Sequence, residues 1–542
     1  MKVSTSTPPG LSSAGLAPED SNPVKLSAQK ADSSLTPEQN PSHAPKSFLL
    51  VEVPNRKAVR LSSAPFPESV ISRFTTKSSA VAFPRILGIE LGLQDPPRLS
   101  GFGWNTGMRP ERMPNFGNRL FTQVSAQDAV RYINVYFDAI WPIFGVLQDR
   151  THVMQICVEA WRLGELPIDV EAIICGMIAL GSLFSPEKVP WAMEAGVVDQ
   201  GLHLLDISMS WPPSQLSLKF VMGWLLRALY LRCTARPHLS WIASCNAVHI
   251  AEAIGLHQDV RNLDSLQQRP QEDLAKEAGF RRKTFWTAMS LNRLFSTECG
   301  RTPLRLDFVT CPLDDLQDQW GSVAHFVDLC ECLPDSTTCA RDLTGNSQAL
   351  GECLQRISDF AAELPALTLF KAEVCFTIYR KMRFFHMTPS ASQIDLILDI
   401  IKDALPEAQS LSHRSWKWWT VVGVPFQSIC VLIAIDTPAS LALLTTAMET
   451  LAGVAGIFDT HLTREALRTA AQLIRGLQKK KSDDIESADR SLENPSVAKA
   501  LADIGAYPLA QPEHFLSLDW LGGVDSSWMD ILFDLDMDQQ ML

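Results

Sequence analysis

The chain has 542 residues and a formal net charge of −12. A chain of this length can bury a large hydrophobic core without disulfide or metal staples. Its acidic balance repels phosphate, whereas duplex DNA binding usually rests on lysine and arginine side chains that neutralise several phosphates. Composition therefore argues against direct DNA binding unless the basic residues gather in a local patch.

The twelve cysteines lie between Cys157 and Cys430, mostly in apolar stretches. This distribution is typical of reduced, buried thiols in an intracellular protein. The first ten residues are rich in Ser, Thr and Pro and lack the apolar core of a secretory signal. The most apolar region, 421–434, is interrupted by Pro425 and is shorter than the roughly 20 residues that cross a bilayer. We therefore expect no membrane partner.

Residues 1–47 are dominated by Pro, Ser, Thr, Ala and isolated charges, so we expect them to be disordered. Residues 48–124 carry short apolar runs between prolines, and we expect an extended arm on the surface of the following domain.

From about Ser125 the spacing of apolar residues becomes helical, since Val130, Ile133 and Phe137 recur at three- and four-residue intervals. Similar patterns predict further helices at about 170–184, 191–209, 217–233, 240–256, 272–298, 365–387, 393–411, 415–435, 438–457 and 463–478. The sequence therefore predicts an all-α fold, with one multi-helix domain at 125–480 between the disordered N-terminal segment and an acidic C-terminal segment.

Lys479, Lys480 and Lys481 suit the C-terminus of a helix, so we expect the helical part to end there and a polar linker to occupy 481–512. The tail, 513–542, interleaves aromatic and aliphatic residues with Asp, and residues 500–542 contain no Lys or Arg. Such a segment cannot fold alone, but its acids keep the apolar groups solvated and available to a partner. The expected anchors are Trp520, Leu521, Trp528, Ile531, Leu532 and Leu535. The alternative is a terminal helix that packs on the protein's own body.

The usual enzyme motifs are missing. The sequence has no Gly-Lys dipeptide, and therefore no P-loop of the usual form, and it has no His-Glu-x-x-His or Gly-x-Ser-x-Gly. The glycines at 101–107 have the wrong last spacing for a dinucleotide loop, and Pro110 stands where a helix should begin. We expect no catalytic residue, no cofactor and no resident metal.

Two cysteine arrangements are candidates for metal or nucleophile sites. Cys245 and His249 lie four residues apart, which would suit a shared metal, but a buried thiol beside a hydrogen-bonded histidine is favoured. The other arrangement consists of Cys330, Cys332, Cys339 and Cys353. Only one residue separates the first two cysteines, which is a poor spacing for zinc ligands, so scattered thiols are favoured.

The basic run 281–283 stands at the start of an amphipathic helix, which favours a structural role over a nucleic-acid patch or a nuclear import signal. A nuclear import signal is also the minority interpretation of the lysines at 479–481.

The segment 277–303 holds an ordered set of motifs: Glu277, then Arg-Arg leading into Phe-Trp, then Asn-Arg, then Gly-Arg-Thr-Pro. It resembles the signature of the fungal-specific transcription factor domain, the middle homology region of the zinc-cluster factors. The matching residues are Arg281, Arg282, Phe285, Trp286, Arg293, Gly300 and Arg301. Further resemblance lies in Tyr132 to Leu147, in Ala243 to His257, and in 424–427 with 435–437, which is similar to a subgroup that includes regulators of carbon-source use.

Three departures from the family pattern stand out: Asn292 replaces the usual Asp, Thr302 is inserted before the Pro, and Gln258 replaces a frequent Arg. The resemblance implies an all-α regulatory domain that acts in the nucleus on RNA polymerase II genes. It also implies a small-molecule inducer, a DNA-binding partner factor or a homodimer as partners of the domain. For the tail we expect the transcription machinery or a coactivator.

Members of this family carry six cysteines that bind two zinc ions near the N-terminus, yet no cysteine precedes Cys157 here. Either the protein acts through a partner that reads DNA, or the gene as predicted lacks an N-terminal exon. The expected function is a fungal transcription regulator, an activator of a metabolic or secondary-metabolite gene set. The alternatives are an inhibitory or scaffold partner of a full-length zinc-cluster factor and, less favoured, an all-helical enzyme.

We predict that the purified chain contains no stoichiometric zinc and binds duplex DNA only weakly, because the six thiolates are absent from it and its net charge is −12. Metal analysis and a binding titration at a fixed salt concentration check this. Two zinc ions per chain, or nanomolar sequence-specific binding by the chain alone, would contradict it.

Overall fold

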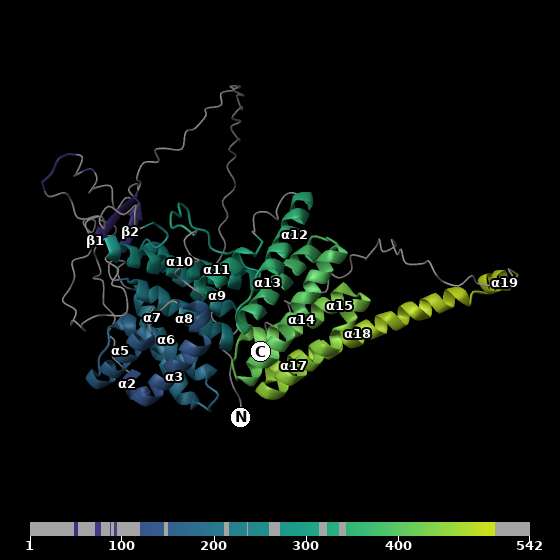
Figure 1. Ribbon diagram of the computed structural model, residues 1–542, viewed down its shortest axis with the longest axis horizontal. Helices are drawn as coiled ribbons and strands as arrows, with labels where there is room; N and C mark the ends of the chain where they lie inside the picture. The colour runs from purple at the N-terminus through teal and green to yellow at the C-terminus, as the bar shows by residue number, and fades with distance from the viewer. Residues whose placement is uncertain are drawn as a thin grey trace, which may run out of the picture. The chain divides into compact units, whose positions relative to one another are not determined.

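The computed structural model describes residues 48–52, 71–76, 87, 91–94, 120–145, 150–210, 216–235, 237–259, 271–313, 322–334 and 343–503. From residue 120 on, these stretches are mainly helical (Figure 1). The helices up to residue 331 are α2 (Leu120–Gln123), α3 (Ala126–Ala139), α4 (Trp141–Phe144), α5 (Arg150–Leu163), α6 (Ile168–Phe184), α7 (Trp191–Ser210), α8 (Leu218–Thr234), α9 (Pro237–Ala253), α10 (Gln271–Glu298) and α11 (Ser322–Glu331). Those that follow are α12 (Leu343–Asp359), α13 (Pro365–Phe384), α14 (Ala391–His413), α15 (Trp419–Ile435), α16 (Pro438–Ala442), α17 (Leu444–Phe458), α18 (His461–Leu492) and α19 (Pro495–Asp503).

The all-α prediction is confirmed. Four predicted helices have both ends within two residues of the observed ones: 170–184 matches α6, 191–209 matches α7, 217–233 matches α8 and 272–298 matches α10. The sequence patterns did not predict α5, α11 or α12, and they joined α16 and α17 into one helix. The predicted helix at 415–435 corresponds to α15, which continues through Pro425.

A β-hairpin lies in the segment expected to be an extended arm. Strand β1 (Phe48–Glu52) pairs antiparallel with β2 (Ile71–Thr76), with Phe48 opposite Thr76. The register shifts between Leu50 and Glu52, and β2 lies next to α9. This pairing between residues far apart in the chain is not visible as alternation in either strand.

Trp418, immediately before α15, lies in the middle of the hydrophobic core and is only 1% exposed. Its ring centroid is 4.8 Å from that of Phe184 in α6, 5.9 Å from that of Phe370 in α13 and 6.0 Å from that of Phe144 in α4. Edge-to-face contacts of this kind add to the free energy gained by burying the rings. The early and late helices therefore share one core.

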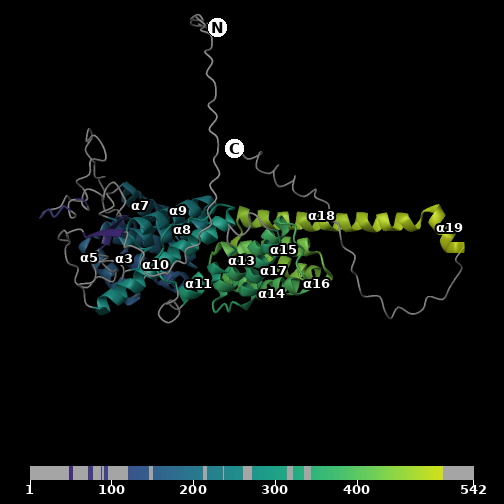
Figure 2. The same ribbon diagram turned by 90° about the horizontal axis from the view of Figure 1, so that it is seen from above.

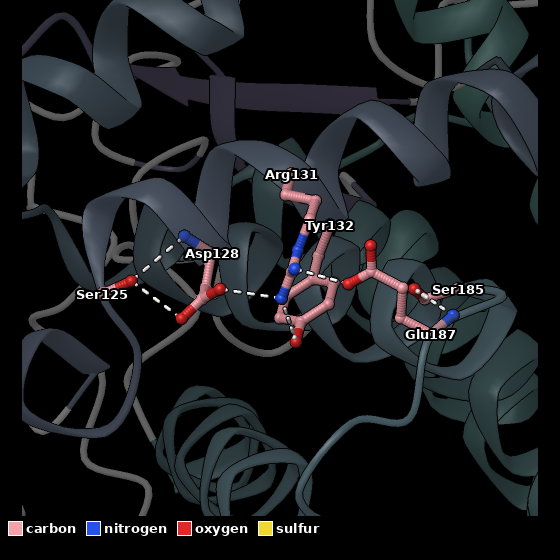
Figure 3. A network of polar contacts seen from close by, with 6 residues as sticks. All are labelled: Ser125, Asp128, Arg131, Tyr132, Ser185 and Glu187. Atoms are coloured by element: carbon pink, nitrogen blue, oxygen red, sulfur yellow. Dashed lines mark hydrogen bonds and ion pairs between the residues drawn. The ribbon is translucent and has the colours of Figure 1, made fainter.

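A polar network at the surface holds α3 to the loop after α6 (Figure 3). Ser125 caps α3 by accepting a hydrogen bond from the Asp128 backbone N–H at 3.1 Å. Arg131 pairs with Asp128 at 2.8 Å and with Glu187 at 2.5 Å. Because all three charged side chains are largely exposed, the network orients the loop more than it stabilises the fold.

The stretch Pro438–Phe458 is long and apolar enough to cross a membrane. In the structure it is divided at Leu443 into α16 and α17, and α17 packs against α14, α15 and α18. One face of α17 is buried, with Ala447, Leu451 and Val454 in the core, and 28% of the apolar window as a whole is buried. The expectation of no membrane partner remains a prediction.

The end of α18 corrects the sequence reading. The helix does not stop at Lys481 but runs to Leu492, and α19 follows inside the segment expected to be a linker. Residues 482–492 contain no Gly or Pro, and Glu486 pairs with Arg490 one turn later at 3.8 Å, an order that favours helix. The three lysines thus lie in the middle of a helix. The boundaries of the domains themselves remain predictions.

Gly181 sets the distance between α3 and α6, because a Cβ at this position would lie 1.9 Å from the carbonyl oxygen of Tyr132. We predict that Gly181→Ala destabilises the protein by about 3 kcal/mol or more, since backbone must move to admit the methyl group. Gly453→Ala in α17 is the matched control, because nothing lies within 4 Å of its Cβ. That variant should gain about 0.5 to 1 kcal/mol from helix propensity. Chemical denaturation measures both, and equal changes would contradict the close approach.

Candidate functional site

In the signature helix α10, the guanidinium of Arg281 is buried. It donates hydrogen bonds to the backbone oxygens of Gly255 at 2.9 Å and Ile254 at 3.4 Å. These carbonyls lie in the turn that follows the end of α9 at Ala253, where Gly255 has a φ of 71°. A cation therefore lies at the negative end of α9. Burial lowers the pKa of Arg281 to about 10, against the opposing charge of Glu277.

The same turn is tied to the segment after α10. The carbonyl oxygen of His257 accepts hydrogen bonds from the backbone N–H groups of Thr310 and Cys311, each at 3.0 Å. Gln258 donates to the Phe308 carbonyl oxygen at 2.6 Å and accepts from the Thr310 hydroxyl at 2.9 Å. The departure at Gln258 therefore builds a neutral link where the family frequently has a cation. Burial, and then the charge of Arg281, lowers the pKa of His257 to about 4, so its imidazole is neutral at physiological pH.

The rest of the basic run does not form an open basic patch. Arg282 is half-buried, and burial lowers the pKa of Lys283 to about 8. Phe285 is buried and packs edge to face on Trp286, with ring centroids 5.1 Å apart. The Trp286 indole N–H donates to the Pro312 carbonyl oxygen at 3.2 Å. These side chains attach α10 to its neighbours and leave little charge to face DNA.

Asn292 and Arg293 connect the middle of α10 to three other segments. Asn292 donates to the Ser244 hydroxyl at 3.1 Å and accepts from the Leu304 N–H at 2.8 Å. Arg293 pairs with Glu331 at 2.7 Å and donates to the Leu333 carbonyl oxygen at 2.5 Å. These contacts join α10 to the middle of α9, to the segment that follows α10 and to the end of α11.

The Gly-Arg turn ends α10. Gly300 has a φ of 62°, the Gly300 N–H donates to the Thr297 carbonyl oxygen, and the Arg301 N–H donates to that of Ser296 at 2.7 Å. This is a Schellman motif, which requires a residue that tolerates positive φ. Arg301 is exposed, and its guanidinium lies over the ring of Trp241 at 5.6 Å from the centroid.

Sequence reasoning missed a second polar cluster, which joins the early helices to the late ones. Glu298, the last residue of α10, pairs with Arg232 of α8 at 2.7 Å and accepts from the Trp419 indole N–H at 3.1 Å. The Arg232 guanidinium lies 4.7 Å from the centroid of the Trp419 ring. No local signal could have found this cluster, because Glu298 and Trp419 are 121 residues apart in the chain.

A carboxylate of the late helices adjoins this cluster. Glu373 of α13 is buried, and Gln427 of α15 donates to both its oxygens at 2.7 and 2.9 Å. Arg380 lies 3.7 Å from Glu373 and donates to Gln427. Burial, and then the charge of Glu298, raises the pKa of Glu373.

The described thiols of the two cysteine arrangements lie among groups that do not indicate a metal or nucleophile site. Cys245 accepts a hydrogen bond from Asn292, and burial raises the pKa of its thiol, while His249 is exposed. Burial raises the pKa of Cys332 to about 11, and Cys353 accepts from Arg356 at 3.2 Å. Among the described residues no group of three or more His, Cys, Asp or Glu side chains is placed to hold a metal ion. Cys339 and the tail anchors named above lie outside the described residues.

One hollow of about 330 Å³ opens beside α11, lined by Ala324, His325, Asp328, Phe360 and Ala361. The His325 imidazole lies 3.7 Å from the Glu363 carboxylate, and its ring meets Phe360 edge to face. The hollow lies within the range of small-molecule sites in size.

The comparisons with known proteins agree with the signature. The fungal specific transcription factor domain matches residues 133–328. Protein RDR1 of Saccharomyces cerevisiae is 33% identical over 460 residues, which are 84% of this chain and 80% of that protein. Transcription factor kojR of Aspergillus oryzae is 31% identical over 462 residues, which are 85% and 80% of the two chains. The chain belongs to the fungal specific transcription factor domain family.

Membership settles the class of protein: the chain belongs with fungal transcription regulators and is not an enzyme. A probable transcriptional repressor of Schizosaccharomyces pombe is also similar, 23% identical over 287 residues, which are 53% of this chain and 60% of that protein. The domain match ends at residue 328, inside α11, whereas the partners of Glu298 extend to Trp419. The helices beyond the matched domain are thus packed into the same site.

Two signature arginines, Arg293 and Arg301, should contribute unequally to the stability of the protein, because their contacts differ. We predict that Arg293→Met costs about 1 to 3 kcal/mol of stability, since it removes the donors to Glu331 and Leu333. Arg293→Lys should be intermediate, because one ammonium group cannot replace the fork of two donors. Arg301→Met should cost about 1 kcal/mol of stability or less, since only the contact of an exposed guanidinium with the Trp241 ring is lost. Denaturant titration of the three variants is the measurement, and equal losses at the two positions would refute this ranking.

Proposed function

We propose that this protein is a nuclear activator of RNA polymerase II genes, with the helical domain as its regulatory part and the tail as its activating part. Family membership supports the transcriptional role. The observation that carries the activating role is the composition of the tail, where large apolar residues alternate with Asp and residues 500–542 contain no Lys or Arg. The tail's partner is the transcription machinery or a coactivator, which it binds through a helix placed in an apolar groove.

The genes controlled belong to a metabolic or secondary-metabolite set, and the domain responds to a small-molecule inducer. The hollow beside α11 supports this part of the proposal, because it combines an aromatic ring, an imidazole and a carboxylate in a space of about 330 Å³. DNA is read by a partner factor or by a zinc cluster outside this sequence, since the net charge and the buried signature arginine favour no direct contact.

A second candidate is an inhibitory or scaffold partner that holds a full-length zinc-cluster factor in nonproductive complexes. The absence of cysteine from the first 156 residues favours it, because this stretch provides none of the six thiolates of a zinc cluster. The similarity to a probable repressor leaves the sign of regulation open to test. A reporter measured with and without the full-length factor separates the two: activation supports our proposal, and a fall below the level given by the factor alone supports the inhibitor.

We predict that residues 510–542, fused to an unrelated DNA-binding domain, activate a reporter. Trp528→Ala combined with Leu532→Ala should remove most of that activity, about tenfold, because both side chains lie on the proposed binding face. The matched control is Met529→Ala combined with Phe533→Ala, which removes apolar groups at the same spacing from the other side of such a helix. A silent fusion contradicts the activating role. Equal losses in both double variants contradict the helical face.

A further inference from the structure

The hollow beside α11 has two walls that come from different parts of the chain. α11 and α13 are in contact, and both views show them next to each other (Figures 1 and 2). One wall is a single face of α11, because Ala324, His325 and Asp328 are neighbours at three- and four-residue spacing. The other wall is Phe360 and Ala361, in the segment that joins α12 to α13.

The second wall is held in place by a lysine of α13. The Lys371 ammonium donates to the carbonyl oxygens of Ser358 at 2.9 Å and Phe360 at 2.7 Å. The His325 ring meets the Phe360 ring edge to face, with centroids 6.4 Å apart. Because these contacts are made within the protein itself, the walls are already in position before a ligand enters, as is usual in small-molecule sites.

Asp328 supplies a negative charge that the surrounding side chains do not balance. Its side chain is partly buried, and burial raises the pKa of its carboxyl group, against the opposing effect of His325. Within the described parts of the chain, no lysine or arginine pairs with this carboxylate, and the neighbouring charge of Glu331 raises its pKa further. A partly desolvated carboxylate is stabilised by a cation placed against it.

The remaining groups restrict the kind of cation. Glu363, whose carboxylate lies 3.7 Å from the His325 imidazole, adds a second negative charge that disfavours an anionic ligand. A metal ion is not favoured, because the described residues include no group of three His, Cys, Asp or Glu side chains placed to hold one. The Phe360 ring and two alanine methyl groups offer apolar surface, and aromatic rings attract organic cations.

The helix that lines the hollow is attached to the signature helix α10 near its start and at its end. Ala324, which lines the hollow, forms with Val327 a small buried cluster against which Trp286 of α10 packs. At the other end of α11, Glu331 pairs with Arg293 at 2.7 Å. A ligand in the hollow therefore contacts a helix that holds two signature residues of α10.

We propose that the hollow beside α11 binds an organic ammonium compound with an apolar body, whose charge pairs with Asp328 and whose body packs against Phe360. This ligand class specifies the small-molecule inducer of the proposed function and so rests on that function. Binding itself can be measured on the purified protein, apart from transcription.

Calorimetric titration of the full chain tests the ligand class with three probes of similar shape: 2-phenylethylammonium, 2-phenylethanol and 3-phenylpropanoate. At one ionic strength the ammonium should bind at least about tenfold more tightly than the alcohol, because only the ammonium pairs with a carboxylate. The propanoate should bind no more tightly than the alcohol. Absence of ammonium binding in the millimolar range overturns the proposal, as does equal or tighter binding of the alcohol or the propanoate.

Three variants test the position of the site. Asp328→Asn keeps the shape of the side chain and should weaken binding of the ammonium about tenfold without changing that of the alcohol. Phe360→Leu should weaken binding of both probes, since both use the ring. The matched control is Asp395→Asn on the exposed side of α14, which should change neither affinity.

Circular dichroism checks that each variant is folded, and Phe360→Leu alone decides the position if Asp328→Asn does not fold. Equal losses in Asp328→Asn and Asp395→Asn overturn the proposed site. Full affinity of Phe360→Leu for the ammonium overturns it as well.

A reporter separates this inference from the inducer role. The full chain is fused to an unrelated DNA-binding domain, and the reporter is measured with and without 2-phenylethylammonium. Calorimetric binding that needs Asp328, together with an unchanged reporter, supports the ligand class and counts against an inducer role for the hollow. A reporter response that Asp328→Asn and Phe360→Leu both leave intact overturns the proposed site and leaves the inducer role standing.

Discussion

The carboxylate of Glu298 is the point on which the packing of early and late helices depends. It lies at the C-terminal end of α10, where the helix dipole disfavours a negative charge. Arg232 and the Trp419 indole offset this by binding both carboxylate oxygens, and the Arg232 guanidinium in turn stacks over the Trp419 ring. Because Glu298 and Arg232 are both largely buried, removing either partner would leave an uncompensated charge, which typically costs about 3 to 5 kcal/mol.

This cluster explains why the helices on either side of residue 328 belong to one core. Trp418 packs among aromatic rings of α4, α6 and α13, while its neighbour Trp419 faces the carboxylate at the end of α10. Two consecutive tryptophans, one just before α15 and one at its first position, therefore serve both the apolar core and the buried ion pair. Burial, and then the charge of Glu298, raises the pKa of Glu373, and Gln427 and Arg380 help to accommodate this second carboxylate.

What the sequence could predict followed from local chemistry. Helix periods located α6, α7, α8 and α10 closely, and the signature pattern pointed to Arg281, Asn292, Arg293 and Gly300, whose contacts now have named partners. Gly255 and Gly300, which belong to the matching stretches, both have a positive φ, a conformation that glycine adopts readily. What failed depended on distant residues. Three lysines indicate a helix end by charge alone, yet α18 continues because the following residues form helix as readily. The pairing of Glu298 with Trp419 has no trace in either segment.

The buried arginines of the signature also bear on how loss of function should be interpreted. Arg281 and Arg293 bind backbone carbonyls of other segments, so a substitution there loosens the domain before it can alter any contact with a partner. A regulator that loses about 1 to 2 kcal/mol of stability can lose abundance several-fold in the cell. An inactive variant at these positions is therefore evidence about folding. Changes that spare these contacts, such as those at Asp328 and Phe360 beside the hollow, leave the signature packing intact and so report on a ligand.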